Sequence, residues 1–146
     1  SRWETDDLTF RLFSVADASD GNNSSCLLHV SGLGIDVLLT GDIEVASETR
    51  LLTFALPHMD LVAAPQQGSA SSSTPAFLNM IRPGLVVVSA GYKNSFHHPG
   101  PLVMQRYRQR NSRVLNTVDH GSVSVHFTDR LIVTLARETH PRFWYK

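Results

Sequence analysis

The chain alternates short hydrophobic segments with segments whose hydrophobic residues recur at helical spacing. In residues 8–13, Leu8, Phe10 and Leu12 occupy every second position, a pattern typical of a strand with one buried face. Residues 26–30 and 35–39 flank a Ser-Gly-Leu-Gly sequence and predict a β-hairpin. Residues 85–89 are a β-branched run, typical of a strand covered on both faces. This alternation predicts an α/β fold.

Capping and proline signals predict three helices. The first follows Asp42 and runs for about three turns to Ala55, before a proline. The second opens at Thr74, the expected N-cap, with a proline at its first helical position, and the third opens at Pro101 and includes Tyr107. Further strands are predicted at residues 60–64, 114–115, 122–127 and 131–135, and a polar turn at residues 17–23.

The composition narrows the class of protein. A chain of 146 residues has room for one compact domain. Its hydrophobic runs fall short of the ~20 residues needed to cross a bilayer, and the acidic start at residues 1–7 does not fit a signal peptide. Cys26 is the single cysteine, which excludes an internal disulfide and a cysteine zinc cluster.

Charge is distributed unevenly along the chain. Residues 1–60 hold three arginines and ten acidic residues, whereas residues 61–146 hold ten Lys or Arg and three acidic residues. Four arginines lie close together in the second part: Arg106, Arg108, Arg110 and Arg113. Such a group can attract phosphates, although a solvated basic helix face is the commoner reading.

Three loops that follow strands hold candidate chemistry. Asp42 follows a hydrophobic strand and a glycine, a position that suits a metal-binding carboxylate and suits the commoner role of N-cap equally well. Gln66 and Gln67 follow the next strand, but amides are poor ligands for zinc or manganese. His97 and His98 follow the strand at residues 85–89, and adjacent histidines of this kind are metal ligands or ordinary surface residues.

These loops together resemble a known family. The order and spacing of Gly-Asn-Asn-Ser-Ser-Cys at 21–26, Leu-Leu-Thr-Gly-Asp at 38–42, Gln-Gln-Gly-Ser at 66–69 and the segment at 89–99 resemble ComEC-type competence proteins. The closing Arg-Phe-Trp-Tyr at 142–145 resembles the end of such proteins. The resemblance implies a polytopic inner-membrane channel that carries transforming DNA inward as a single strand. It also implies a C-terminal domain with the metallo-β-lactamase fold, thought to be a metal-dependent nuclease.

By this resemblance, Asp42 and His98 are the expected catalytic and metal-binding residues. The positions expected to line the site are Asn22, Ser25, Ser69, Asn94 and His97. Gln66 and Gln67 stand where the family has two histidines, and Gly100 stands where it often has another. The arginines at 106, 108, 110 and 113 are the candidate nucleic-acid contacts.

The resemblance implies that this chain is the C-terminal half of one domain, namely half of a metallo-β-lactamase-type αββα sandwich, with a mixed sheet and helices on one face. The main histidine cluster is expected upstream. Manganese or zinc is expected in the intact domain, and none in this chain alone. The expected partners are single- or double-stranded DNA, the rest of the parent channel, and a second copy bound through a bare sheet face. The parent protein is expected in the bacterial inner membrane, with this domain on the periplasmic face.

Two alternatives to a nuclease role remain open. In the first, the domain handles DNA without catalysis, and the arginines with Ser69 and the serines at 71–73 contact phosphates. The same serines are equally typical of a loop with a helix cap. In the second alternative, the domain stabilises the channel. The glutamines favour both alternatives, whereas Asp42 and His98 favour the nuclease.

Overall fold

The computed structural model describes residues 1–15 and 24–140. The predicted polar turn, Asn22, and the closing residues 142–145 lie outside the described residues. The strands are β1 (Arg2–Thr5), β2 (Leu8–Ser14), β3 (Cys26–Gly32), β4 (Ile35–Leu39), β5 (Leu61–Ala63), β6 (Leu85–Val88), β7 (Arg113–Asn116), β8 (Val123–Phe127) and β9 (Leu131–Leu135). The helices are α1 (Val45–Leu51), the 3-10 helix η2 (Pro65–Gly68), α2 (Pro75–Ile81), α3 (Pro101–Arg108), α4 (Thr117–His120) and α5 (Ala136–Thr139).

A seven-stranded mixed sheet organises the chain, with its strands in sequence order from β1 to β7. Strands β1 to β4 pair antiparallel, and the predicted hairpin of β3 and β4 is among these pairs. Strands β4 to β7 pair parallel, because α1, α2 and α3 return the chain to the same end of the sheet. The α/β prediction with a mixed sheet is confirmed.

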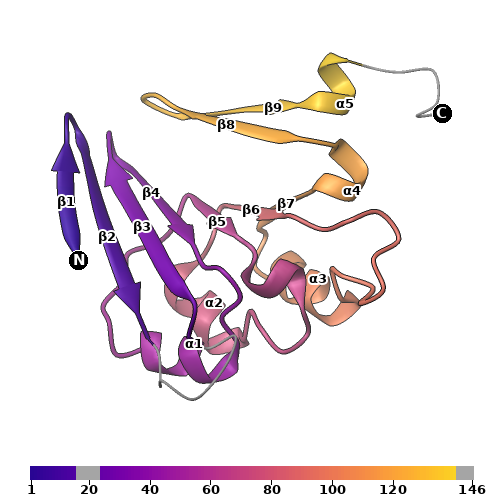
Figure 1. Ribbon diagram of the computed structural model, residues 1–146, viewed down its shortest axis with the longest axis horizontal. Coiled ribbons are helices and arrows are strands. Elements are labelled where there is room, and N and C mark those ends of the chain that lie inside the picture. The colour runs from indigo at the N-terminus through magenta and orange to yellow at the C-terminus, as the bar shows by residue number, and fades with distance from the viewer. Residues whose placement is uncertain (16–23, 141–146) are drawn as a thin grey trace.

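The main hydrophobic core lies between one face of this sheet and the helices α1, α2 and α3, which Figure 1 shows together on that side. Leu38, Val62 and Val86 contribute from β4, β5 and β6. Phe77 from α2 and Tyr107 from α3 are fully buried against them. Burial of such side chains stabilises the fold by about 1.5–3 kcal/mol each.

The opposite face of the sheet was expected to be bare, and that expectation is wrong. The antiparallel hairpin of β8 and β9 lies across it (Figure 1) and forms a second hydrophobic cluster with Val37, Leu61 and Leu115. An open hydrophobic hollow of about 280 Å³ remains between hairpin and sheet, beside Val87 and Phe127. The hairpin covers this face of the sheet with residues of the same chain. The strand patterns at residues 123–127 and 131–135 predicted the two strands but not where they pack. Self-association through this face stays a prediction.

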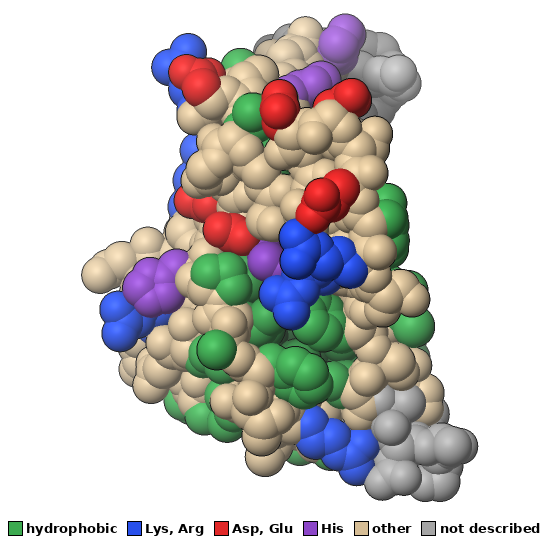
Figure 2. Space-filling model, turned by 90° about the vertical axis from the view of Figure 1, so that its left-hand side faces the viewer, with side chains coloured by type: hydrophobic (Ala, Val, Ile, Leu, Met, Phe, Trp, Pro, Cys, Tyr) green, Lys and Arg blue, Asp and Glu red, His purple; other side chains and the backbone are tan. Residues whose placement is uncertain are grey.

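The N-terminal edge of the sheet differs from its parallel half. All residues of β1 are exposed, and Trp3 stacks on Phe10 with ring centroids 5.3 Å apart. Figure 2, which views the molecule from this side, shows hydrophobic side chains in the middle of the face with Lys and Arg side chains adjoining them. None of the helices in the described residues is long and hydrophobic enough to cross a membrane.

The first helix is shorter than predicted and begins later. Its seven residues start at Val45, and its N-cap is Glu44, which makes no side-chain capping hydrogen bond. Asp42 lies in the preceding turn, so the N-cap reading of Asp42 is wrong. The caps predicted for the other helices are confirmed, since Thr74 accepts a hydrogen bond from the Phe77 N–H and Pro101 opens α3.

Candidate functional site

The three loops singled out in the sequence follow β4, β5 and β6, which are adjacent and parallel. Their carboxyl ends therefore meet at one edge of the sheet, where ligands of open α/β sheets usually bind. Hydrogen bonds join the loops directly: the Thr40 hydroxyl donates to Ala63 O at 2.8 Å and the Gln66 N–H to Gly41 O at 3.0 Å. The Gly100 N–H donates to Gly68 O at 2.9 Å. The loops thus form one connected surface.

A pocket of about 250 Å³ lies between these loops. Its lining consists of Asp42, Gln66, Gln67, Phe96 and His98. The carboxylate and the imidazole expected from the sequence therefore face the same space, together with both glutamines. Phe96 is an additional wall that was not singled out from the sequence.

Asp42 is exposed and held at its backbone. Its N–H donates to the Ser25 hydroxyl at 3.2 Å, so Ser25 supports the turn that carries the carboxylate. Gly41 makes that turn with φ +58°, and a Cβ there would lie 3.2 Å from the Ser25 Cβ. A side chain at position 41 would therefore disturb the placement of Asp42.

His98 is fixed by Asn94. The Asn94 amide donates to His98 O at 2.8 Å and accepts from the His98 N–H at 2.9 Å. The His98 ring stacks on Phe96, with centroids 5.6 Å apart. Asn94 is thus a positioning residue behind the pocket. His97 is exposed and is not part of the pocket lining.

Gln66 and Gln67 adopt left-handed backbone conformations, with φ of 45° and 53°. Such conformations are uncommon for residues other than glycine. The Gln66 side-chain oxygen lies 2.6 Å from the Ser71 hydroxyl, which is also 3.0 Å from a Glu44 carboxylate oxygen. Ser69 joins this group through the same hydroxyl, at 3.0 Å. Ser69 is not part of the pocket lining, and the Gln66 amide oxygen is engaged by the protein.

A buried polar cluster behind the loop was not identified from the sequence. The Glu48 carboxylate of α1 accepts hydrogen bonds from the Ser73 and Thr74 N–H groups, and Tyr107 of α3 pairs with the Ser73 hydroxyl at 2.6 Å. Burial raises the pKa of Glu48 above its usual value and raises the pKa of Tyr107 to about 12. The three-residue spacing places Glu48 on the same helix face as the hydrophobic Leu51, and this spacing was the sequence signal that could have indicated a buried Glu48.

The four predicted nucleic-acid arginines do not form one patch. Arg106 donates to Ser72 O at 2.8 Å, and Arg110 donates to the Asn79 side chain at 3.0 Å and to Pro75 O at 3.1 Å. Arg108 is exposed.

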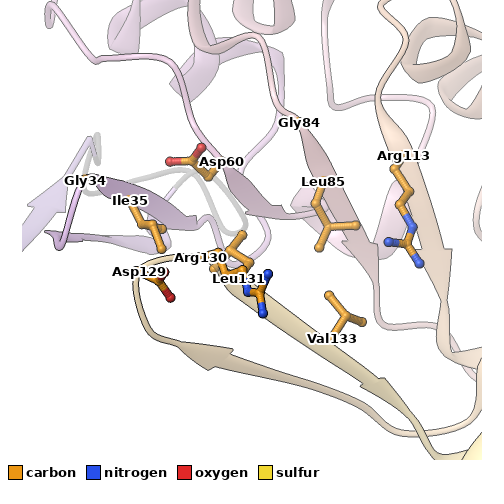
Figure 3. A pocket seen from close by; sticks show the side chains of 10 residues that line it. All are labelled: Gly34, Ile35, Asp60, Gly84, Leu85, Arg113, Asp129, Arg130, Leu131 and Val133. Carbon is orange, nitrogen blue, oxygen red and sulfur yellow. The ribbon is translucent and has the colours of Figure 1, made fainter.

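Arg113 lies elsewhere, in a larger hollow of about 410 Å³ that also contains Asp60 and Arg130 (Figure 3). That hollow lies at the amino ends of β5, β6 and β7, whereas the candidate pocket lies at the carboxyl ends of β4, β5 and β6. It therefore holds none of the residues expected to bind metal, and we keep the smaller pocket as the candidate site.

The donor set of the pocket does not fit a catalytic metal by itself. Asp42 and His98 provide one carboxylate and one imidazole, whereas a catalytic zinc keeps three protein ligands. Within residues 1–15 and 24–140, no three His, Cys, Asp or Glu side chains come together to bind a metal. The amides of Gln66 and Gln67 are weak substitutes.

Comparison with known proteins agrees with the motifs. The chain is 33% identical over 147 residues to Recombination protein 2 of Haemophilus influenzae, covering 98% of the chain and 18% of that protein. It is 31% identical over 126 residues to Competence protein ComA of Neisseria gonorrhoeae, covering 84% of the chain and 18% of that protein. It is 30% identical over 128 residues to ComE operon protein 3 of Bacillus subtilis, covering 86% of the chain and 16% of that protein.

The chain spans less than a fifth of the length of these relatives. No family model matches it, so the metallo-β-lactamase part of the expectation stays a prediction. The similarity to these relatives supports a competence-protein family for the chain.

Proposed function

We propose that the chain is a DNA-handling part of a competence protein that takes up DNA, and that its pocket is one share of a nuclease-type metal site. The observation that carries this proposal is the convergence of Asp42 and His98, from loops far apart in sequence, on one pocket at the sheet edge. In the proposal, the parent protein lies in the inner membrane, with this domain on its periplasmic face.

The proposal includes that this chain does not cleave DNA alone. A two-metal nuclease site places its cations about 3.5–4 Å apart and needs several ligands for them. Asp42 and His98 are too few, so the remaining ligands would come from another part of the parent protein. The present chain would supply a carboxylate, an imidazole and a fixed wall around them.

Calorimetric titration of Mn²⁺ and Zn²⁺ tests this proposal. The complete domain of the parent protein is compared with this chain and with an Asp42→Asn variant of the complete domain. We expect tight binding by the complete domain, weak binding by the chain, and loss of binding in the variant. Asn94→Ala should weaken binding less than Asp42→Asn, because it loosens His98 without removing a ligand. Equal binding by the Asp42→Asn variant would contradict the proposed site.

A second candidate function is DNA handling without catalysis. The observation that favours it is Gln66, which stands in the pocket lining with its amide oxygen already engaged by the Ser71 hydroxyl at 2.6 Å. A Gln66→His/Gln67→His variant of the complete domain separates the two functions. Metal binding in the variant alone would favour the non-catalytic role, whereas binding by the natural domain would favour the nuclease.

A further inference from the structure

The loop between β6 and α3 exposes two aromatic side chains beside the pocket. Tyr92 and Phe96 are 73% and 76% exposed, more than any other large hydrophobic side chain in the described residues. Phe96 also lines the pocket with Asp42 and His98. Figure 1 shows this loop extending away from the sheet between β6 and α3. Two large rings are therefore presented to solvent next to the candidate site.

The loop that carries these rings is internally fixed. Asn94 donates from its amide to Gly91 O at 2.9 Å and to His98 O at 2.8 Å, and the His97 N–H donates to Asn94 O at 3.1 Å. Tyr92 and Phe96 lie on either side of Asn94, so both rings are held on an ordered turn. A surface that is ordered before binding loses less conformational freedom when a ligand binds.

The charge around the rings favours a phosphate-containing ligand. Within residues 89–100, Lys93 is the single Lys or Arg and there is no Asp or Glu, while the Asp42 carboxylate lies in the pocket that Phe96 also lines. The Lys93 ammonium lies 5.3 Å from the centroid of the Tyr92 ring, and His98 stacks on Phe96. A cationic group such as the Lys93 ammonium beside exposed aromatic rings is an arrangement that binds single-stranded nucleic acids, in which bases stack on the rings and phosphates approach the cation.

The exposure of the rings selects single strands over duplexes. In a duplex each base is already stacked between its neighbours, so a protein ring gains contact only where a base is unpaired. A single strand offers its base faces without that cost. We infer that the β6–α3 loop is a stacking platform on which Phe96 and Tyr92 bind unpaired bases of DNA, next to the pocket of Asp42 and His98. This inference rests on the proposed function and names the form of DNA that the site receives.

Fluorescence anisotropy with labelled oligonucleotides tests the platform. The full chain is titrated into oligothymidylate of about 12 nucleotides, within the site sizes of known single-strand binders. An abasic strand of the same length and a duplex serve as comparisons. Phe96→Ala and Tyr92→Ala are each expected to weaken oligothymidylate binding by roughly 5- to 100-fold, the effect of one stacked base. The abasic strand and the duplex should bind weakly and respond little to either variant.

Matched variants separate stacking from simple hydrophobic contact. Leu102→Ala removes a side chain that is 50% exposed at the start of α3 and has no aromatic ring, so binding should be unchanged. Phe96→Trp should retain binding, whereas Phe96→Leu should lose it as Phe96→Ala does. Circular dichroism on each variant confirms that the chain is folded.

The outcomes are distinguishable. Equal affinity for the abasic strand and oligothymidylate, or no effect of either alanine variant, overturns the platform and leaves the proposed function in place. Binding to vesicles of phosphatidylglycerol that depends on Phe96, without a matching effect on DNA, also overturns it in favour of a membrane surface. Failure to bind any of the DNA forms overturns both the platform and the proposed function.

Discussion

The two loops that flank Asp42 are built in opposite ways. Residues 64–74 turn their polar groups inward, where Ser72 and Ser73 are fully buried and the Glu48 carboxylate accepts two backbone hydrogen bonds. Residues 89–100 are held by the Asn94 side chain and, at Ala90, by the Thr117 hydroxyl, and they expose Tyr92 and Phe96. Both loops follow parallel strands and reach the same pocket.

The two loops therefore contribute differently to the site: one fixes residues of the pocket, and the other provides exposed contact surface. The loop at residues 64–74, called the inner loop, fixes the glutamines, because Glu48 of α1 and the adjacent Arg106 and Tyr107 of α3 all hydrogen-bond to it. The loop at residues 89–100, called the outer loop, contributes contact surface, because its Tyr92 and Phe96 rings are mostly exposed. In the proposed function, the fixed loop at residues 64–74 forms one side of the pocket, and the exposed rings of the loop at residues 89–100 hold a DNA strand beside it.

The loops meet at Gly68, and this junction gives the largest predicted effect. Gly68 has φ +83°, and a Cβ there would lie 2.8 Å from the Pro99 Cβ in the other loop. Gly68→Ala should lower the free energy of unfolding by about 2–4 kcal/mol, since a left-handed alanine costs ~1–2 kcal/mol and the overlap adds to it. Urea denaturation followed by circular dichroism measures the change.

Gly34→Ala is the matched control for this prediction. Gly34 also has positive φ, +76°, but a Cβ there meets no atom within 4 Å. Its substitution should therefore cost only the backbone strain, about 1 kcal/mol. Equal losses for the two variants would show that the contact between the loops contributes nothing, and the two loops would then be independent.

The buried anchor of the inner loop gives the second prediction. Glu48→Gln leaves one of the two backbone donors facing an amide group, so near pH 4.5 the variant should be less stable by about 1–3 kcal/mol. Because burial raises the pKa of Glu48, the native state binds its proton more tightly than the unfolded state does. The free energy of unfolding therefore falls as pH rises from the usual value near 4.5 through the raised pKa.

The glutamine variant lacks this titration, so the stability gap between the chain and the variant should narrow as pH rises. Thermal and urea unfolding at several values between pH 4.5 and pH 8 measure the gap. A gap that widens with pH would mean that the two backbone donors outweigh burial and hold the pKa of Glu48 below its usual value. The inner loop would then be anchored by a charge, like many surface loops.

The strands and the position of the site follow from local patterns in the sequence. The β-branched run at 85–89 produced β6 because burial on both faces favours such residues. Strand β2 forms where the alternation at residues 8–13 predicted it, but Leu12 is exposed and Phe13, from the other face, packs against the main core. Asp42, Gln66 and His98 were recognisable because each follows a strand. The parallel order of β4, β5 and β6 then brings the loops together.

Long-range contacts could not be predicted in the same way. The acidic Glu48 is typical of a solvated surface in the sequence, because its partners, the N–H groups of Ser73 and Thr74, lie 25 or more residues away along the chain. Arg106 and Arg110 look like a basic patch in sequence, but loop carbonyls and Asn79 engage them in the fold. The cover supplied by β8 and β9 likewise depends on how the hairpin folds back.

The arginines of α3 give the smallest predicted effect. They compare an exposed side chain, Arg108, with one that hydrogen-bonds within the protein, Arg110. Arg108 is exposed, so Arg108→Ala should change the free energy of unfolding by less than about 0.5 kcal/mol. If Arg108 contacts a DNA phosphate, the variant should bind DNA a few-fold more weakly and lower the salt slope of binding by about 0.9 for a duplex or 0.7 for a single strand.

Arg110→Ala should do the reverse. It removes hydrogen bonds to Asn79 and Pro75 and should lower the free energy of unfolding by about 1 kcal/mol, with little change in the salt slope. Anisotropy titrations at several salt concentrations, beside urea denaturation, measure both quantities. If Arg110→Ala changes the salt slope as much as Arg108→Ala does, the Arg110 guanidinium leaves its partners to bind phosphate, and the helix presents both arginines to DNA. If only Arg108→Ala changes it, the inward hydrogen bonds persist in the complex and the contact surface of α3 is limited to its outer face.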